Sequence, residues 1–110
     1  MRTDMIQHVE TQLSALEAAL VALELWQSQP PEPSRLASQE PFAIDTLEPH
    51  EWLQWIFIPR MRALLEAQAA LPRNFAISPY IEEAMKETAQ LERILTPIYA
   101  LEALLNDTAD

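Results

Sequence analysis

Apolar residues recur every three or four positions near the start of the chain, and this spacing predicts a long amphipathic helix over residues 3–28. The apolar seam consists of Ile6, Val9, Leu13, Leu16, Leu20 and Leu23. Glu10, Glu17 and Glu24 recur every seven residues and are expected to form an acidic face elsewhere on this helix. The helix is predicted to stop at SQPPEPS, because proline cannot donate the hydrogen bond that continues a helix.

The remaining pattern predicts a proline-rich loop followed by further helices. Residues 29–45 are expected to form an extended loop that Phe42 and Ile44 attach to the core. Helices are then expected over about residues 46–69, 79–87 and 89–106. No alternation typical of a strand persists along the chain. We therefore predict an all-α bundle of four or five helices, with the proline-rich loop after the first long helix.

Polar residues and prolines mark the predicted helix starts. Thr46 is expected to cap the second helix, with Pro49 in its first turn. Ser78 followed by Pro79 has the same arrangement and is expected to begin the next helix. Pro59 lies inside the second predicted helix, so we expect it to bend that helix or to divide it into two abutting ones.

Composition narrows the classes of function. A chain of 110 residues fits one domain, spanning residues 1–110. It contains no glycine, which excludes the glycine-rich loops that bind nucleotide phosphates, and no cysteine, which excludes disulfides and thiolate chemistry. The N-terminus lacks the apolar core of a signal peptide, and no stretch approaches the ~20 apolar residues that span a bilayer. The protein is expected to be soluble and cytoplasmic.

Charge indicates which partners are compatible with the chain. The sequence has 17 acidic and 7 basic residues, and its net charge is −10. A surface of this sign repels a phosphate backbone, so direct nucleic-acid binding is not expected. A protein partner with a basic patch would instead be attracted to the acidic face of the first helix. Acidity that only keeps the chain in solution explains the same composition, and the sequence leaves both interpretations open.

The sequence contains no recognisable catalytic or metal-binding motif. The serines are scattered, and none lies in a nucleophile elbow. Glu102 lies among leucines but can occupy the outer face of the last helix, so it does not by itself indicate an acid–base site. His50 and the nearby Asp45, Glu48 and Glu51 are better explained as a solvated helix start than as a metal site. We therefore expect no catalytic residue, no cofactor and no metal.

The stretch EPHEWLQWIFIPRM concentrates the large apolar side chains of the protein. Trp52 and Trp55 are expected on one face of a helix that is apolar most of the way round, and such a helix is usually buried. In the alternative interpretation one tryptophan lies at a groove edge beside Arg60 or Arg62, since tryptophan and arginine often stabilise interfaces. Tyr80 would complete this candidate pocket.

Arg60 has a structural alternative to this binding role. It follows a proline in an acidic chain, so it could pair inside the fold with Asp45, Glu48 or Glu51. We favour this pairing over substrate binding, because a buried ion pair strongly resists the loss of one partner.

The block EPFAIDTLEPHEWLQWIFIPRMRALLE, followed by LPRNFAISPYIEEAM, resembles the YqcC-like family of small bacterial proteins. The likeness in layout extends over essentially the whole chain, but only Pro41–Met61 is specific. The resemblance implies an all-helical bundle of no established biochemical function, so it supplies no catalytic residues. It also implies a gene that often neighbours one for a tRNA pseudouridine synthase, which is an association and not evidence of contact.

The sequence is compatible with three functions. The first is a non-enzymatic interaction module whose partner has a basic patch, specifically an RNA-modifying enzyme. The second is an enzyme or small-ligand binder that uses a pocket near Trp52, Trp55, Arg60 and Tyr80. The third is self-association through an apolar seam left on the first or last helix. The sequence determines neither the oligomeric state nor the identity of a partner.

Overall fold

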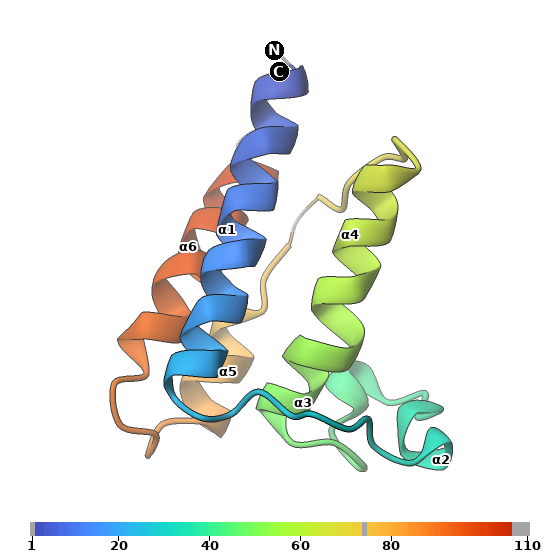
Figure 1. Cartoon of the computed structure of the whole chain (residues 1–110), viewed down its shortest axis with the longest axis vertical. Helices are drawn as coiled ribbons and strands as arrows, with labels where there is room; N and C mark the ends of the chain where they lie inside the picture. The colour runs from blue at the N-terminus through green and yellow to red at the C-terminus, as the bar shows by residue number, and fades with distance from the viewer. Residues whose placement is uncertain (1, 74, 107–110) are drawn as a thin grey trace.

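A computed structural model describes residues 2–73 and 75–106, and in these residues it contains helices and turns but no strand. Two long helices, α1 (Arg2–Ala22) and α6 (Glu92–Asn106), lie side by side, and a third long helical segment stands beside this pair (Figure 1). The predicted all-α bundle is confirmed. None of the described helices is long and apolar enough to cross a membrane.

The α1–α6 pair forms the main part of the core. The α1 seam residues Val9, Leu13, Leu16 and Leu20 are 0% exposed. They belong to one apolar cluster with the α6 residues Ile94, Ile98, Leu101 and Leu105. Burial of these side chains stabilises the pair, because apolar surface is removed from water. These eight side chains are buried within one chain, so they would not form a contact between two copies. Self-association through another apolar surface of the first or last helix stays a prediction.

Helix α1 ends earlier than predicted, at Ala22 instead of residue 28. The Leu25 N–H donates to the Leu20 carbonyl at 2.9 Å, and the Glu24 N–H donates to the Val21 carbonyl at 3.0 Å. These are the bonds of a Schellman motif, whose central residue has left-handed backbone angles. Glycine usually fills that position, but the chain has none, and Glu24 occupies it with a φ of 63°. Glu24 therefore lies beyond the helix that was expected to carry it.

The proline-rich segment is less extended than predicted. It contains a short helix, α2 (Pro33–Leu36), and a 3₁₀ turn, Pro41–Ala43. Phe42 is half-buried and packs against the core, as expected. Ile44 is 61% exposed, so the prediction that it attaches this segment to the core is wrong.

The central helical segment runs through α3 (Pro49–Trp52), a π-helical turn (Leu53–Phe57) and α4 (Ile58–Glu66). The Ile58 N–H bonds the Leu53 carbonyl, five residues back. This wider turn directly precedes Pro59, whose ring would clash with the carbonyl four residues earlier in a regular α-helix. The expected interruption near Pro59 is therefore present, although α4 ends at Glu66 instead of residue 69.

Helix α5 (Ser78–Ala84) starts where predicted but is capped differently. The Glu102 carboxylate, which comes from α6, accepts hydrogen bonds from the N–H groups of Ile77 (2.8 Å) and Ser78 (2.7 Å). The Ser78 hydroxyl donates to the same carboxylate at 2.8 Å. Predicting Ser78 as the cap and placing Glu102 on the outer face were both wrong. Together these bonds hold the start of α5 against α6.

Candidate functional site

The tryptophan-rich block begins with a buried polar joint centred on Glu51. Glu51 is 5% exposed, and its Oε1 atom accepts hydrogen bonds from Arg35 Nη2 at 2.7 Å and from the Glu48 N–H at 2.8 Å. Its Oε2 atom accepts from Gln27 Nε2 at 3.0 Å. Burial acts to raise the pKa of Glu51, but these hydrogen bonds and the charges of Arg35 and His50 outweigh it and leave the pKa lowered. The carboxylate is therefore a structural anion.

Gln54 and Trp55 extend this joint to the segment that follows α1. The Gln54 side chain accepts from the Gln27 N–H and donates to the Gln27 carbonyl, both at 2.8 Å. Trp55 Nε1 donates to Gln27 Oε1 at 2.7 Å. The central helical segment thus bonds Gln27 at two places. Gln54 bonds its backbone, and Glu51 and Trp55 bond its side chain. The polar positions of the EWLQW motif fasten the proline-rich segment to the central helix.

Arg35 takes the role that the sequence suggested for Arg60. Its Nε donates to the Thr46 carbonyl at 2.9 Å, while Thr46 Oγ1 donates to the Arg35 carbonyl at 2.7 Å. Thr46 is therefore not the helix cap, a position that Glu48 occupies in a capping box with Glu51. The predicted pairing of Arg60 with a carboxylate of this region is wrong. The only sequence signal for Arg35 was its position as the one basic residue of the proline-rich loop.

Trp52 lies within a continuous series of five aromatic rings. Phe42 stacks on Tyr80, with ring centroids 4.2 Å apart, and meets Trp52 edge-on at 5.0 Å. Trp52 stacks on Phe57 at 5.5 Å, and Phe57 stacks on Phe75 at 5.4 Å. Trp52 is only 9% exposed, so this tryptophan belongs to the core. The rings come from four parts of the chain, which sequence spacing alone could not bring together.

A pocket of about 380 Å³ borders this aromatic series. It is lined by Phe42, Trp52, Phe57, Arg60, Met61, Leu64, Ala70, Pro72, Phe75 and Ile77. Arg60 is exposed and is the only charged residue that the described part of the chain contributes to this lining. The structure thus brings together Trp52 and Arg60 of the predicted pocket, with Tyr80 stacked behind Phe42. Trp55 and Arg62 do not line it.

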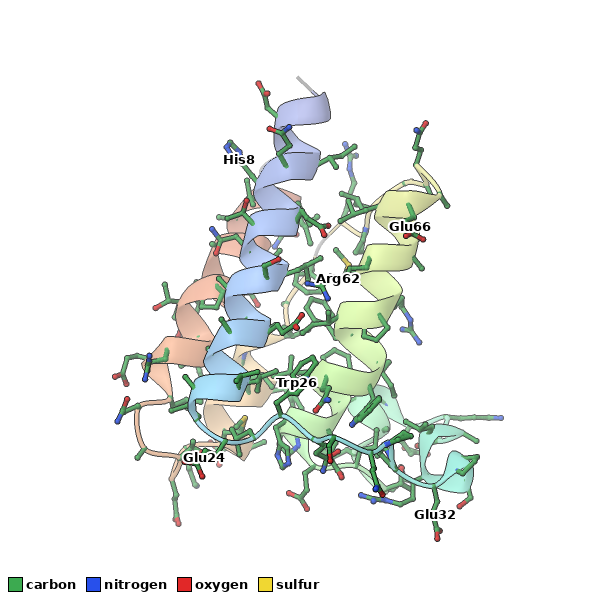
Figure 2. All side chains as sticks on the ribbon, in the orientation of Figure 1. His8, Glu24, Trp26, Glu32, Arg62 and Glu66 are labelled. Atoms are coloured by element: carbon green, nitrogen blue, oxygen red, sulfur yellow. The ribbon has the colours of Figure 1, made fainter. Side chains whose placement is uncertain are left out.

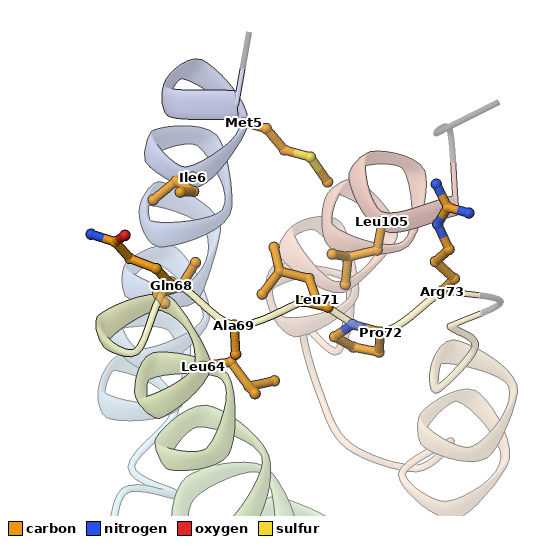
Figure 3. A pocket seen from close by; sticks show the side chains of 11 residues that line it. Met5, Ile6, Leu64, Gln68, Ala69, Leu71, Pro72, Arg73 and Leu105 are labelled. Atoms are coloured by element: carbon orange, nitrogen blue, oxygen red, sulfur yellow. The ribbon is translucent and has the colours of Figure 1, made fainter. Parts of the chain in front are cut away.

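A second pocket, of about 320 Å³, shares Leu64, Ala70 and Pro72 with the first. Its lining comes from α1, α4, α6 and the segment after α4, with Arg73 at one end (Figure 3). Arg73 is exposed and is the only charged residue among the described residues that line this second pocket. We call the two adjoining pockets together the α4 groove.

Arg62 points toward α1 (Figure 2) and lines neither pocket of this groove. Its Nη1 atom lies 2.9 Å from Glu17 Oε1, and its Nε atom lies 3.9 Å from Glu10 Oε2. The predicted acidic face therefore contributes two carboxylates to a contact between α1 and α4, and Glu24 lies past the end of the helix. Exposed ion pairs usually contribute less than about 1 kcal/mol to the free energy of unfolding. Arg62 therefore bridges α1 and α4 but adds little to the stability of their packing.

Two comparisons with known proteins decide the family. A family model described as DUF446, tRNA pseudouridine synthase C, matches residues 8–104. The protein YqcC of Escherichia coli is 44% identical over 102 residues, covering 92% of this chain and 94% of YqcC. The chain belongs to the YqcC-like family. The solution NMR structure of YqcC has a TM-score of 0.84 at 42% identity, covering 96% of this chain and 92% of that one.

Two further proteins are similar in sequence to this chain. An uncharacterized protein of Haemophilus influenzae is 53% identical over 107 residues, which cover 97% of both chains. A tRNA pseudouridine synthase C of Pectobacterium carotovorum is 49% identical over 67 residues. That match covers 61% of this chain but only 18% of the synthase, so a YqcC-like segment is a minor part of that protein.

Proposed function

We propose that this YqcC-like protein is a non-catalytic module that binds a tRNA pseudouridine synthase. The observation that carries the proposal is the Pectobacterium protein of that name, in which a segment 49% identical to this chain occupies 18% of the polypeptide. A segment joined to an enzyme in one polypeptide is kept at a high effective concentration beside it. We propose that the separate chains make the corresponding contact by binding. The name of the matching family model points to the same enzyme.

The charge of the chain favours contact with the enzyme over contact with its RNA. The net charge of −10 repels a phosphate backbone, whereas an enzyme that binds tRNA needs a basic surface. Glu24 is exposed after the end of α1, and Glu10 and Glu17 keep a net negative charge around Arg62. These carboxylates are proposed to attract the basic surface of the synthase, mainly by accelerating association.

The polar groups of the fold support a non-catalytic role. In the part of the chain that the structure describes, every buried side-chain nitrogen and oxygen atom has a hydrogen-bond partner. Among the side chains that the structure describes, the buried polar or charged ones are those of Glu51, Gln54 and Ser78, and each bonds another segment of the fold. Groups engaged in this way hold the backbone in place, and none of the three lines either pocket of the α4 groove.

A binding measurement between the purified full chain and the tRNA pseudouridine synthase C of the same organism tests the proposal. Isothermal titration at low and moderate salt should give a complex whose affinity falls as salt rises, because screening weakens long-range attraction. In stopped-flow mixing, Glu24→Gln should lower the association rate constant, whereas Glu87→Gln, an exposed change of equal charge near α5, should leave it unchanged. Absence of a complex at low salt would refute the proposed function.

A small-ligand role is the second candidate, and the first pocket favours it. Its volume of about 380 Å³ and its aromatic wall beside Arg60 would suit an aromatic or acyl carboxylate. Saturable binding of such a compound at micromolar concentration, lost in Arg60→Glu, would support this role. Binding only at millimolar concentration would argue for the protein partner instead.

A further inference from the structure

We propose that the α4 groove is the docking site for the synthase, and that it receives an amphipathic segment with apolar side chains flanked by carboxylates. This inference rests on the proposed function and adds to it the surface and the chemistry of the contact. It differs from the attraction by Glu24 and its neighbours, which acts at long range and needs no defined pocket.

The charge of the groove is opposite to that of the protein as a whole. Among residues 2–73 and 75–106, each of its two pockets has a single charged lining residue, and in both cases it is an arginine, Arg60 or Arg73. The sequence has 17 acidic residues and 7 basic ones, so a randomly chosen charged residue is more often acidic than basic. Two arginines beside apolar walls therefore differ from the average charge of the chain. A carboxylate placed on either guanidinium would form a charge-assisted, two-point hydrogen bond.

Both arginines are available for such a contact. Arg35, Arg62 and Lys86 each form an ion pair with a glutamate. Arg60 and Arg73 are exposed, and neither forms an ion pair with any residue of 2–73 or 75–106. An incoming carboxylate would therefore not have to displace an internal partner there.

Ring contacts hold the aromatic wall of the first pocket in place. Trp52 is held between Phe42 and Phe57, and Phe57 is held in turn by Phe75. Phe42 keeps a φ of 57°, a left-handed conformation that a bulky side chain adopts only where its surroundings enforce it. A preformed wall reduces the ordering that binding requires, which favours an apolar side chain entering the first pocket.

A second copy of this chain is a poor occupant. The apolar seams of α1 and α6 are buried against each other. The exposed large apolar side chains of the described residues are Val21, Ile44 and Tyr99, which lie on α1, the proline-rich segment and α6. Three isolated side chains do not form the apolar stripe that would fill two adjoining pockets.

Fluorine NMR on the full chain labelled with 5-fluorotryptophan tests the inference directly. The unlabelled synthase adds no signal, and Trp→Phe variants assign the resonances of Trp26, Trp52 and Trp55. Addition of the synthase should shift the Trp52 resonance most, because among these three residues only Trp52 lines the groove.

Two groove variants and one matched control complete the experiment. Arg60→Glu reverses the charge at the first pocket, and Ala70→Trp fills the space where the pockets adjoin. Each should weaken synthase binding about tenfold, chiefly through faster dissociation. Arg93→Glu makes the same charge reversal at an exposed residue outside both linings and should change the affinity less than about twofold.

The outcomes separate failure of this inference from failure of the proposed function. If the synthase binds but the Trp52 resonance does not shift and both groove variants bind like wild type, only the groove assignment is overturned. If wild type shows no binding at any salt concentration, both proposals fall.

Two other results would assign the groove to a different occupant. If the Trp52 resonance shifts with rising chain concentration in the absence of the synthase, and sedimentation shows a dimer, the occupant is a second copy. A micromolar Trp52 response to phenylacetate, with none to the synthase, assigns it to a small ligand, and either result overturns the inference.

Discussion

The Glu51 carboxylate accepts a 2.7 Å hydrogen bond from the Arg35 guanidinium, and this pair joins the proline-rich segment to the first turn of the central helix. The Glu51 side chain is 7% exposed, whereas that of Arg35 is 40% exposed. The anion thus lies inside the fold, and the cation covers it from the solvent side. Loss of the anion and loss of the cation should therefore have different consequences for stability.

Replacing Glu51 with alanine should lower the free energy of unfolding by about 2–4 kcal/mol, because three donors lose their acceptor. Glu51→Gln keeps an acceptor oxygen, so it should lower the free energy of unfolding by less than Glu51→Ala does. Denaturant unfolding followed by circular dichroism measures both values. Glu40→Ala is the control, since Glu40 is exposed and such changes usually alter stability by less than about 0.5 kcal/mol. Equal effects of Glu51→Ala and Glu40→Ala would contradict a structural role for Glu51.

The lowered pKa of Glu51 predicts a pH dependence with a definite sign. A carboxylate whose folded-state pKa lies below its ordinary value of 4.5 contributes stability above that pH and loses the contribution as pH falls through the folded-state pKa. The difference in unfolding free energy between wild type and Glu51→Gln should therefore be largest near neutral pH and shrink below about pH 4.5. A difference that stays constant down to pH 3 would show that ionisation of Glu51 does not stabilise the fold.

Gln54→Leu should destabilise the protein by about 2–4 kcal/mol, although it replaces a 4% exposed polar side chain with an apolar one of similar size. The reason is that the N–H and carbonyl groups of Gln27 would both lose their partners. Thermal and denaturant unfolding measure the change. Gln7→Leu, the same substitution at an exposed site of α1, should be nearly neutral. Comparable stability of the two variants would mean that solvent readily replaces Gln54.

Glu24→Gly should stabilise the protein by about 0.5–1 kcal/mol, because glycine adopts the φ of 63° without the steric cost that a Cβ atom imposes. Ala22→Gly is the matched control, two residues earlier and still inside α1. There glycine should destabilise by about 1 kcal/mol. If both variants lower the free energy of unfolding, the left-handed conformation of Glu24 is not strained. Glu24→Gln from the binding experiment separates the effect of charge from the effect of backbone.

Local pattern predicted much of the architecture. The three-and-four spacing from Val9 to Leu20 identified the buried stripe of α1, because a helix places such residues on one face whatever packs against it. Pro59 marked the interruption of the central helix because its missing N–H is a property of the residue itself. The start of α5 was also found, since Pro79 favours the first turn of a helix.

The polar contacts were mostly mispredicted, since their partners are distant in the sequence. Glu102 caps α5 from 24 residues away, and Arg35 pairs with Glu51 across 16 residues. Neighbouring residues offered plausible partners for the same groups, such as Ser78 for the cap and Arg60 for the ion pair. Local reasoning favours those neighbours because it cannot evaluate distances across the fold.

The sequence by itself determined the helical class, the apolar stripes and the family, because helix periodicity, proline geometry and the EPHEWLQWIFIPRM block are local properties. Only the tertiary structure decided that Trp52 is buried in an aromatic series, that Trp55 holds Gln27, and that Arg60 stands unpaired beside an apolar pocket. The physical reason is that burial and pairing depend on which segments meet. That outcome comes from the packing of the whole chain, which no short stretch of it contains.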